Sequence, residues 1–229
     1  MSTPKEPCLE ADGIVLSYRH TNVLSNIYLK CRPGEIVGLL GRNGCGKSSL
    51  LKIMFGVLAG ECQSVRVDGR YVYPAYRHYR GIKLLPQEPF LPEGLRVREA
   101  YRLFTGLASP PGDELPEIRQ RWAMRIGELS GGEKRTVETL LLLLSDARYL
   151  LLDEPFTHLS PVQIERLLHL VRTHGAGKGI ILSDHQYRYV LSLCHRVVLL
   201  TQGRTVALND PQELVDRGYI SSLDQDFQD

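Results

Sequence analysis

The sequence contains no long apolar run and no strong excess of charge of either sign. Its longest wholly apolar stretch is residues 140–144, far below the roughly 20 residues that a helix needs to cross a bilayer. We therefore expect no transmembrane segment. The formal net charge of the 229 residues is only +2, so electrostatics gives no reason to expect nucleic acid or an acidic membrane surface as a partner. The first seven residues lack the apolar core of a signal peptide, which predicts a cytoplasmic protein.

Cysteine is sparse, and its spacing shows no pairs. An odd number of cysteines in a chain without a secretion signal predicts reduced thiols. The spacing also matches no metal-binding pattern, so we expect no structural metal. The five cysteines are Cys8, Cys31, Cys45, Cys62 and Cys194.

What the sequence does contain is a glycine-rich loop between a predicted strand and a predicted helix. Residues 41–49 have a glycine, four residues, a glycine, a lysine and a serine, after the apolar run 36–40 and before apolar residues at helical spacing. Such a loop wraps its backbone N–H groups around a phosphate chain, and the helix N-terminus adds partial positive charge. We expect Lys47 to reach the β- and γ-phosphates and Ser48 to bind magnesium. A glycine turn that binds nothing is the alternative, and the match at every fixed position argues against it.

A pair of acids follows a short apolar strand. Residues 149–152 predict a strand that is buried on both faces of a parallel sheet, and Asp153, Glu154 and Pro155 come directly after it. Carboxylates at the carboxyl end of such a strand face the ligand side of the sheet. Asp153 is then a candidate magnesium ligand, and Glu154 is a candidate base for an attacking water. A turn with solvated acids remains the alternative for this pair alone.

Two glycines open a predicted helix. In the run Leu-Ser-Gly-Gly-Glu at residues 129–133, Ser130 and Glu133 have the spacing of a capping box, and the apolar run 140–144 predicts that the later part of the helix is buried. The capping box does not explain Gly131 and Gly132, because each glycine weakens a helix by roughly 1 kcal/mol against alanine. A phosphate at the helix N-terminus would require a bare backbone there.

The remaining pattern predicts further strands and a helical insertion. We expect a hairpin of residues 9–17 and 26–31, single strands at 65–67, 82–85 and 180–182, and a late hairpin of 196–200 and 205–208. Gln87 follows one of these strands, and His185 follows another. Residues 91–127 predict helices broken by proline and glycine, with Arg119, Arg121 and Arg125 on a solvated helix face and Trp122 and Ile126 on the packed side. Residues 71–80 mix tyrosine with arginine, a combination that is able to stack on nucleic acid, but the near-neutral charge of the chain favours an amphipathic surface strand and loop.

The order of these motifs along the chain resembles the ATP-binding-cassette (ABC) ATPases. The serine-glycine-glycine run just upstream of the two-acid strand is specific to that family, whereas the glycine loop alone occurs in many nucleotide-binding proteins. The resemblance implies an α/β fold with a P-loop NTPase core, a mostly parallel sheet, a flanking antiparallel β part and a small helical subdomain. It implies one domain over residues 1–229, with the helical subdomain inserted at approximately 91–144.

The resemblance also assigns roles to particular residues. Tyr18 stacks on adenine, Gln87 senses the metal and couples to a partner, and Asp153 supports magnesium. Glu154 is the general base, and His185 contacts the γ-phosphate. Two cassettes pack head to tail, so that Ser130, Gly131 and Gly132 of one complete the ATP site of the other. The loop residues expected to hold the phosphates of ATP and Mg²⁺ are Gly41, Asn43, Gly44, Cys45, Gly46, Lys47, Ser48 and Ser49.

The function implied by the resemblance is ATP hydrolysis that powers an ABC transporter. The chain would work as a homodimer or paired cassette, peripheral to the inner face of a membrane and in contact with it only through separate transmembrane subunits. The alternatives are a soluble cassette ATPase that acts on nucleic acid or ribosomes, and a nucleotide-gated scaffold. A single cassette without added domains favours transport by analogy. Residues 181–188 are similar to branched-chain amino-acid and lipopolysaccharide-export ATPases, a likeness that assigns no cargo.

Three positions depart from the family pattern. Ser160 stands where the family usually has aspartate in a loop that crosses the dimer interface, although serine still suits the N-cap of the following helix, with Gln163 completing a capping box. Glu133 stands where glutamine is common, and we expect it to preserve activity. The segment between Gln87 and Ser130 is short, which implies a trimmed helical subdomain.

Overall fold

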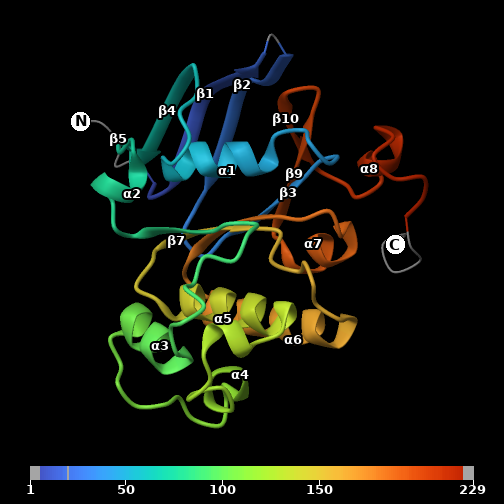
Figure 1. Cartoon of the computed structure of the whole chain (residues 1–229). Coiled ribbons are helices and arrows are strands. Elements are labelled where there is room, and N and C mark those ends of the chain that lie inside the picture. The colour runs from blue at the N-terminus through green and yellow to red at the C-terminus, as the bar shows by residue number, and fades with distance from the viewer. Residues whose placement is uncertain (1–5, 20, 224–229) are drawn as a thin grey trace.

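The computed structural model describes residues 6–19 and 21–223 of the chain. Two β-sheets and a set of helices form stacked layers, with the smaller sheet at the top of Figure 1 and the helical part at the bottom. Among the described residues, every helix is too short or too polar to cross a bilayer.

The larger sheet has six strands and is mostly parallel, as the sequence predicts. Its strand order is β10, β9, β3, β8, β7, β6, and only β10 runs antiparallel to its neighbour. The carboxyl ends of β3, β8, β7 and β6 therefore lie along one edge, where ligands of such sheets bind. The bounds are β3 Ile36–Leu40, β6 Ile82–Leu85, β7 Tyr149–Asp153, β8 Gly179–Ser183, β9 Arg196–Thr201 and β10 Arg204–Leu208.

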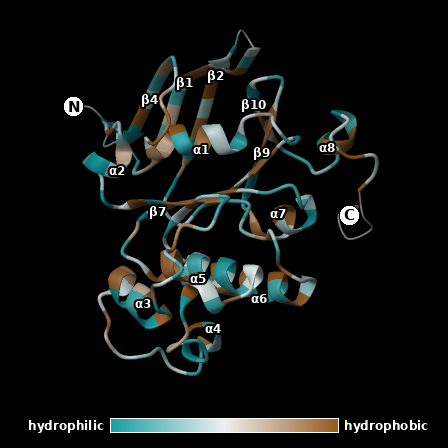
Figure 2. Cartoon of the chain, in the orientation of Figure 1, coloured by the Kyte–Doolittle hydropathy of each residue, from teal (hydrophilic) through white to brown (hydrophobic). Residues whose placement is uncertain are grey.

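The strands of this sheet are apolar on both faces because each face has its own core. In β7, Leu150 and Leu152 belong to one buried cluster, whereas Tyr149 and Leu151 belong to the other. Successive side chains of a strand point to opposite faces, so residues 149–152 of β7 are apolar whichever core they face. Figure 2 shows the result as brown ribbon along β7 and β9.

The smaller sheet covers one face and is antiparallel. β1 (Leu9–Tyr18) pairs with β2 (Thr21–Cys31), which confirms the predicted hairpin, and β4 (Cys62–Val67) pairs with the other edge of β1. Helix α1 (Lys47–Phe55) contributes to the same core as this sheet and lies between the two sheets in Figure 1. The segment predicted as surface strand and loop forms β5 (Arg70–Tyr71) and a short helix, α2 (Ala75–His78).

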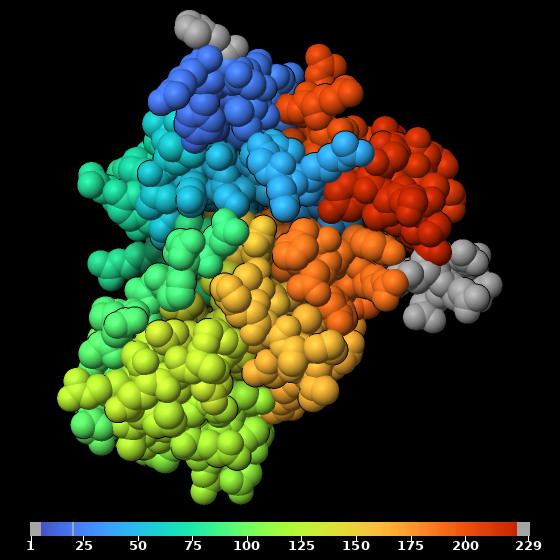
Figure 3. All heavy atoms as spheres, turned by 45° about the vertical axis from the view of Figure 1, so that its right-hand side comes forward, coloured from blue at the N-terminus to red at the C-terminus, as the bar shows by residue number. Residues whose placement is uncertain are grey.

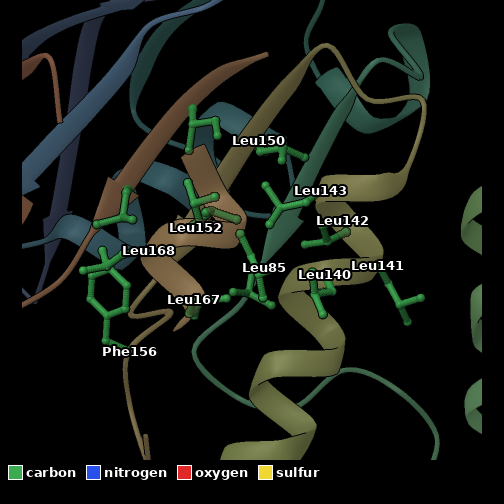
Figure 4. Close-up of a cluster of buried hydrophobic side chains, with 14 of the residues drawn as sticks. Leu85, Leu140, Leu141, Leu142, Leu143, Leu150, Leu152, Phe156, Leu167 and Leu168 are labelled. Atoms are coloured by element: carbon green, nitrogen blue, oxygen red, sulfur yellow. The ribbon is translucent and has the colours of Figure 1, made fainter. Parts of the chain in front are cut away.

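Three helices cover the opposite face of the larger sheet: α5 (Gly131–Leu144), α6 (Pro161–His174) and α7 (Tyr187–Leu193). In Figure 4, Leu140 to Leu143 of α5 gather with Leu85, Leu150 and Leu152 of the sheet. The longest apolar run of the sequence, residues 140–144, therefore belongs to a helix of the core. A last short helix, α8 (Glu213–Asp216), follows β10.

The helical part forms a lobe at one end of the molecule, visible in green to yellow-green in Figure 3. It contains α3 (Val97–Thr105), α4 (Pro116–Arg119) and the 3-10 turn η1 (Ile126–Glu128), and α3 and α4 contact α5. Helix α5 also contacts β6 and β7, so it joins this lobe to the sheet.

One prediction in the lobe is wrong. The sequence places Arg119, Arg121 and Arg125 on one solvated helix face, but α4 ends at Arg119 and the three arginines do not share a helix. Arg121 is half-buried and pairs with Glu133, with an Nη2–Oε1 distance of 2.6 Å. Trp122 does pack as expected, against Tyr101 with ring centroids 5.5 Å apart.

Candidate nucleotide site

The glycine loop lies between β3 and α1, as predicted. Gly44 and Gly46 have φ values of 77° and 108°, a left-handed conformation that glycine adopts without steric cost. Helix α1 has no side-chain cap and no acid in its first turn, so its N-terminal N–H groups are directed at the loop without a competing side chain. Lys47 is buried, and its Nζ donates to Gly41 O at 2.7 Å and to Arg42 O at 3.4 Å. The loop thus presents a helix N-terminus and an ammonium group, a combination suited to phosphate.

A pocket of about 480 Å³ joins this loop to the ends of the neighbouring strands. Its walls come from the end of β1, the loop and α1, and the residues that follow β6, β7 and β8. Most of the residues that the sequence predicts as nucleotide contacts therefore face one space. The lining residues are Tyr18, Val23, Asn43, Gly44, Gly46, Lys47, Ser48, Ser49, Gln87, Glu154 and His185.

Val23 is the one lining residue that the sequence analysis missed. It lies in β2, and a Cβ placed on Gly46 would be 2.8 Å from Val23 Cγ1. The close approach shows why position 46 needs glycine in addition to its φ. A valine in a strand carries no signal in the sequence that separates a pocket wall from ordinary core.

Two predicted loop residues, Gly41 and Cys45, do not line this pocket. Cys45 lines a neighbouring pocket of about 320 Å³ with Arg42 and Tyr219. A Cβ placed on Gly41 would be 2.6 Å from Cys45 Sγ, so the thiol packs against the back of the loop. There the chain after α8 supports the loop, because Arg42 Nη2 donates to Gly218 O at 2.8 Å.

The acid pair lies at the carboxyl end of β7. Asp153 is buried, and its Oδ1 accepts a hydrogen bond of 2.6 Å from Ser183 Oγ on the adjacent strand β8. Its Oδ2 is also buried and has no hydrogen-bond partner among residues 6–19 and 21–223. A buried carboxylate oxygen without a partner is costly unless a cation or an ordered water satisfies it.

This oxygen fits a magnesium site, where substrate and water supply most of the ligands, better than a metal site whose ligands are all protein side chains. Within the part of the chain that the structure describes, no three histidine, cysteine or acidic side chains gather around a common metal position. Mg²⁺ is typically held by one or two protein oxygens together with waters and substrate phosphates. Asp153 Oδ2, the Ser48 hydroxyl in the pocket wall and the Gln87 amide oxygen match that donor chemistry.

Glu154 is partly exposed to the pocket and is held from several sides. Its Oε2 accepts from Gln87 Nε2 at 3.1 Å and from Thr157 Oγ1 at 3.3 Å. Its backbone N–H donates to Ser183 O at 2.7 Å, and its φ of 50° lies in the left-handed region. Non-glycine residues in that region are uncommon and mark a backbone held by its surroundings. The bend directs a carboxylate toward the pocket at the end of a core strand.

His185 reaches the pocket from the end of β8. Its side chain is about half exposed, and its Nδ1 lies 3.6 Å from Asp184 Oδ1. Asp184 is fully buried and accepts from the backbone N–H groups of Gln186 at 2.9 Å and Phe156 at 3.3 Å. Burial raises the pKa of Asp184, while those N–H donors and His185 act in the opposite direction. Asp184 thus fixes the turn that carries the histidine.

The serine-glycine-glycine run forms the N-terminus of α5 and does not line the pocket. Ser130 is the N-cap: its Oγ accepts from Glu133 N at 3.3 Å, and Glu133 Oε2 accepts from Ser130 N at 2.9 Å. Ser130 and Gly131 are exposed, whereas Gly132 is buried. The structure therefore bears out the capping box and separates the two glycines.

The two glycines differ in how closely other atoms approach them. A Cβ on Gly132 would be 2.8 Å from the carbonyl oxygen of His158, in the loop between β7 and α6, so packing within the chain requires a bare backbone. A Cβ on Gly131 would meet nothing nearer than 3.7 Å. Of the two, only Gly131 lacks an explanation within the described chain. In the same loop, Ser160 caps α6 together with Gln163 as predicted.

The chain is similar in sequence to ATP-binding proteins of ABC transporters. The sequence profile of the ABC transporter family matches residues 24–157. The lipopolysaccharide export system ATP-binding protein LptB of Acidithiobacillus ferridurans is 32% identical over 229 residues, which span 94% of this chain and 95% of that protein. The protein of the same name from Escherichia coli K12 is 29% identical over 238 residues, or 96% and 98% of the two chains.

Solved structures agree with these sequences. The structure described as the ATP-binding subunit of an ABC transporter superposes with a TM-score of 0.75 at 26% identity, and covers 95% of this chain and 96% of that one. A bacterial Atm1-family ABC exporter with ATP bound gives a TM-score of 0.77 at 19% identity over 94% of this chain and 41% of the exporter, which supports the fold alone.

Proposed function

The chain belongs to the ABC transporter family, and on this premise we propose that it is an ATP-hydrolysing subunit whose catalytic site is completed by a second cassette. The observation that carries the proposal is the pocket that joins Lys47 and Ser48 to Gln87, Glu154 and His185. It brings phosphate-binding groups, a carboxylate and a histidine to the ends of four adjacent strands. These are the parts that ATP hydrolysis needs, because phosphoryl transfer depends on positioning and charge stabilisation more than on covalent chemistry.

Within this proposal each side chain has a task. Lys47 exchanges its bonds to Gly41 O and Arg42 O for phosphate oxygens, because a buried ammonium gains more from an anion than from carbonyl groups. Glu154 orients the attacking water and accepts its proton. His185 donates to the phosphate that leaves. Tyr18, half exposed at the pocket rim, offers its ring to the base of the nucleotide.

Magnesium is part of the proposal through Asp153 and Ser48. Asp153 Oδ2, buried and without a partner in the described chain, would hold the ion directly or through a water, with Ser48 and Gln87 as the other protein oxygens. Bound Mg²⁺ neutralises charge on the phosphates of ATP. Ser183 holds Asp153 by its 2.6 Å hydrogen bond to Oδ1, which leaves Oδ2 without a hydrogen-bond partner in the described chain.

The exposed position of Gly131 supports a role for a second cassette. Ser130 and Gly131 begin a helix of 14 residues, are exposed and do not line the pocket of their own chain. We propose that this helix N-terminus meets the phosphates bound by another copy in a head-to-tail pair, as the family resemblance implies. The pair closes around ATP and opens after hydrolysis, and this motion drives separate membrane-spanning subunits.

A dilution experiment tests the proposal. If two chains share each site, ATP turnover per chain should fall steeply when the purified protein is diluted below the dissociation constant of its dimer. Raising the protein concentration again should restore the turnover per chain. Turnover per chain that is independent of concentration, in a protein shown to be monomeric by sedimentation, would count against a shared site. The transport part is tested by cell fractionation, with and without expression of the membrane-spanning subunits that are encoded beside this chain. The proposal predicts that the chain co-purifies with membranes only when those subunits are expressed. A chain found solely in the soluble fraction under that condition would favour the soluble cassette ATPase.

A further inference from the structure

Helix α5 buries two opposite charges one turn apart. Arg135 and Glu138 have side chains that are 5% and 0% exposed, and Arg135 Nη1 lies 3.9 Å from Glu138 Oε2. Burial lowers the pKa of Arg135 and raises that of Glu138, in each case as the largest influence. Taking two charges out of water costs more than their attraction returns unless further hydrogen bonds satisfy them. The hydrogen-bond partners of Arg135 and Glu138 therefore indicate the role of this ion pair.

Glu138 holds the chain on the C-terminal side of the loop that contains Gln87. Its Oε1 accepts from Phe90 N at 2.8 Å and from Leu91 N at 3.1 Å. Arg135 holds the other side of the same loop, because its Nη1 donates to Pro86 O at 2.6 Å. One turn of α5 thus brackets the loop at both ends, and Gln87 lies between the two attachments.

Arg135 also reaches the carboxyl end of β7. Its Nε and Nη2 donate to Glu154 O at 3.2 and 2.9 Å, and Nη2 donates to Asp153 O as well. Glu154 has a φ of 50°, in the left-handed region that is sterically unfavourable for an L-residue. A guanidinium bonded to its carbonyl oxygen stabilises that bend, and the bend directs the carboxylate into the pocket.

We propose that Arg135 is a positioning residue that fixes Gln87 and Glu154 relative to each other and to helix α5. Its planar fork spans carbonyls from two separate segments, a task that a single ammonium group cannot perform with the same geometry. The same helix begins at Ser130 and Gly131, so a displacement of α5 on pairing reaches the water-activating carboxylate through Arg135. The inference rests on the proposed role of Glu154 as general base.

The test separates catalysis from binding. Arg135→Met should keep the equilibrium dissociation constant for ATP within about threefold of wild type, because the hydrogen bonds of Arg135 go to residues 86, 153 and 154 rather than to the phosphate loop. Its kcat should fall by about 10- to 100-fold, the loss typical of a misplaced catalytic group. Arg135→Lys should recover part of kcat. Arg148→Met removes a half-exposed arginine paired with Asp68 at the other end of β7 and should leave both constants unchanged.

A second variant guards against misfolding. Arg135→Met leaves Glu138 buried without a countercharge, whereas Arg135→Met with Glu138→Gln removes both charges and keeps an amide oxygen for Phe90 N and Leu91 N. We expect this double variant to unfold at a urea concentration near that of wild type and still to show the low kcat. Recovery of wild-type kcat in the folded double variant would overturn the proposal, as would a folded Arg135→Met with a raised KM and normal kcat.

Glu154→Gln, assayed beside these variants, separates the two claims. If it hydrolyses ATP normally, the proposed function of Glu154 is wrong whatever Arg135 does. If it is inactive while Arg135→Met and the double variant are fully active, only the positioning role fails.

Discussion

Gln87 Nε2 donates a hydrogen bond of 3.1 Å to Glu154 Oε2, and so links the loop after β6 to the acid after β7. The bond occupies a lone pair of the carboxylate that we propose as general base. Gln87 also belongs to the loop that α5 brackets through Pro86 and Phe90. Gln87 therefore contacts the proposed base and lies in a loop that is held by helix α5.

The first prediction concerns Glu154→Gln. The substitution keeps the shape of the side chain and removes its ability to accept a proton, so ATP binding should persist while turnover falls by at least about 100-fold. Because we propose that the pair opens only after hydrolysis, the variant should accumulate as a dimer with ATP. Sedimentation with and without ATP measures the dimer, and a phosphate-release assay measures turnover. Normal phosphate release would remove Glu154 as the base.

The second prediction contrasts the two glycines at the start of α5. Gly132→Ala should lower the free energy of unfolding by about 1–3 kcal/mol, because its Cβ would lie 2.8 Å from His158 O in a packed region. Gly131→Ala should not lower it, since an added Cβ would meet no atom nearer than 3.7 Å in one chain. Its ATP turnover should nevertheless fall by about tenfold if a partner's phosphate approaches there. Urea denaturation and ATPase assays on both variants would decide, and full activity in Gly131→Ala would contradict the assignment.

The third prediction concerns the pH dependence of stability at Glu133. Hydrogen bonds from the Ser130 N–H and from Arg121 lower the pKa of Glu133 below its usual value of about 4.3. Because the folded state favours the charged form, this carboxylate stabilises the fold above its usual pKa, and the contribution is lost as pH falls through the folded pKa. Glu133→Gln should therefore cost about 1 kcal/mol at pH 7, and the difference from wild type should narrow below about pH 4.3. A difference that widens in acid would contradict this. Turnover at pH 7 should persist.

The sequence predicts the strands of the larger sheet well because both of their faces are buried. Residues 36–40 are apolar without interruption and form β3, and residues 82–85, which are apolar except for Lys83, form β6 at the predicted bounds. The site residues at the ends of these strands could also be predicted, because the carboxyl ends of parallel strands meet at one edge. Caps behave similarly: Ser130 and Ser160 act through local hydrogen bonds that spacing alone indicates.

Contacts between distant segments could not be predicted in this way. Arg135 occurs beside Lys134 in a helix, a pattern that normally indicates a solvated face, and only the approach of residues 86 and 154 shows why it is buried. The same holds for Gly132, whose requirement comes from His158. Arg121 has the periodicity of a helix face, but α4 begins at Pro116 and ends at Arg119, before Arg121. Sequence spacing carries no information about which loop will lie against a given helix.

A mixing experiment tests the central claim, that the pocket around Lys47 is half of a site, most directly. In chains that also carry Glu154→Gln, Lys47→Ala removes the phosphate contact and Gly131→Asp places a negative charge at the start of α5. Neither variant alone should dimerise with ATP, because each homodimer lacks one half of both sites. Their mixture should form dimers detectable by sedimentation, since each mixed pair contains one complete site. ATP-dependent dimerisation of the Gly131→Asp chain by itself would contradict the account.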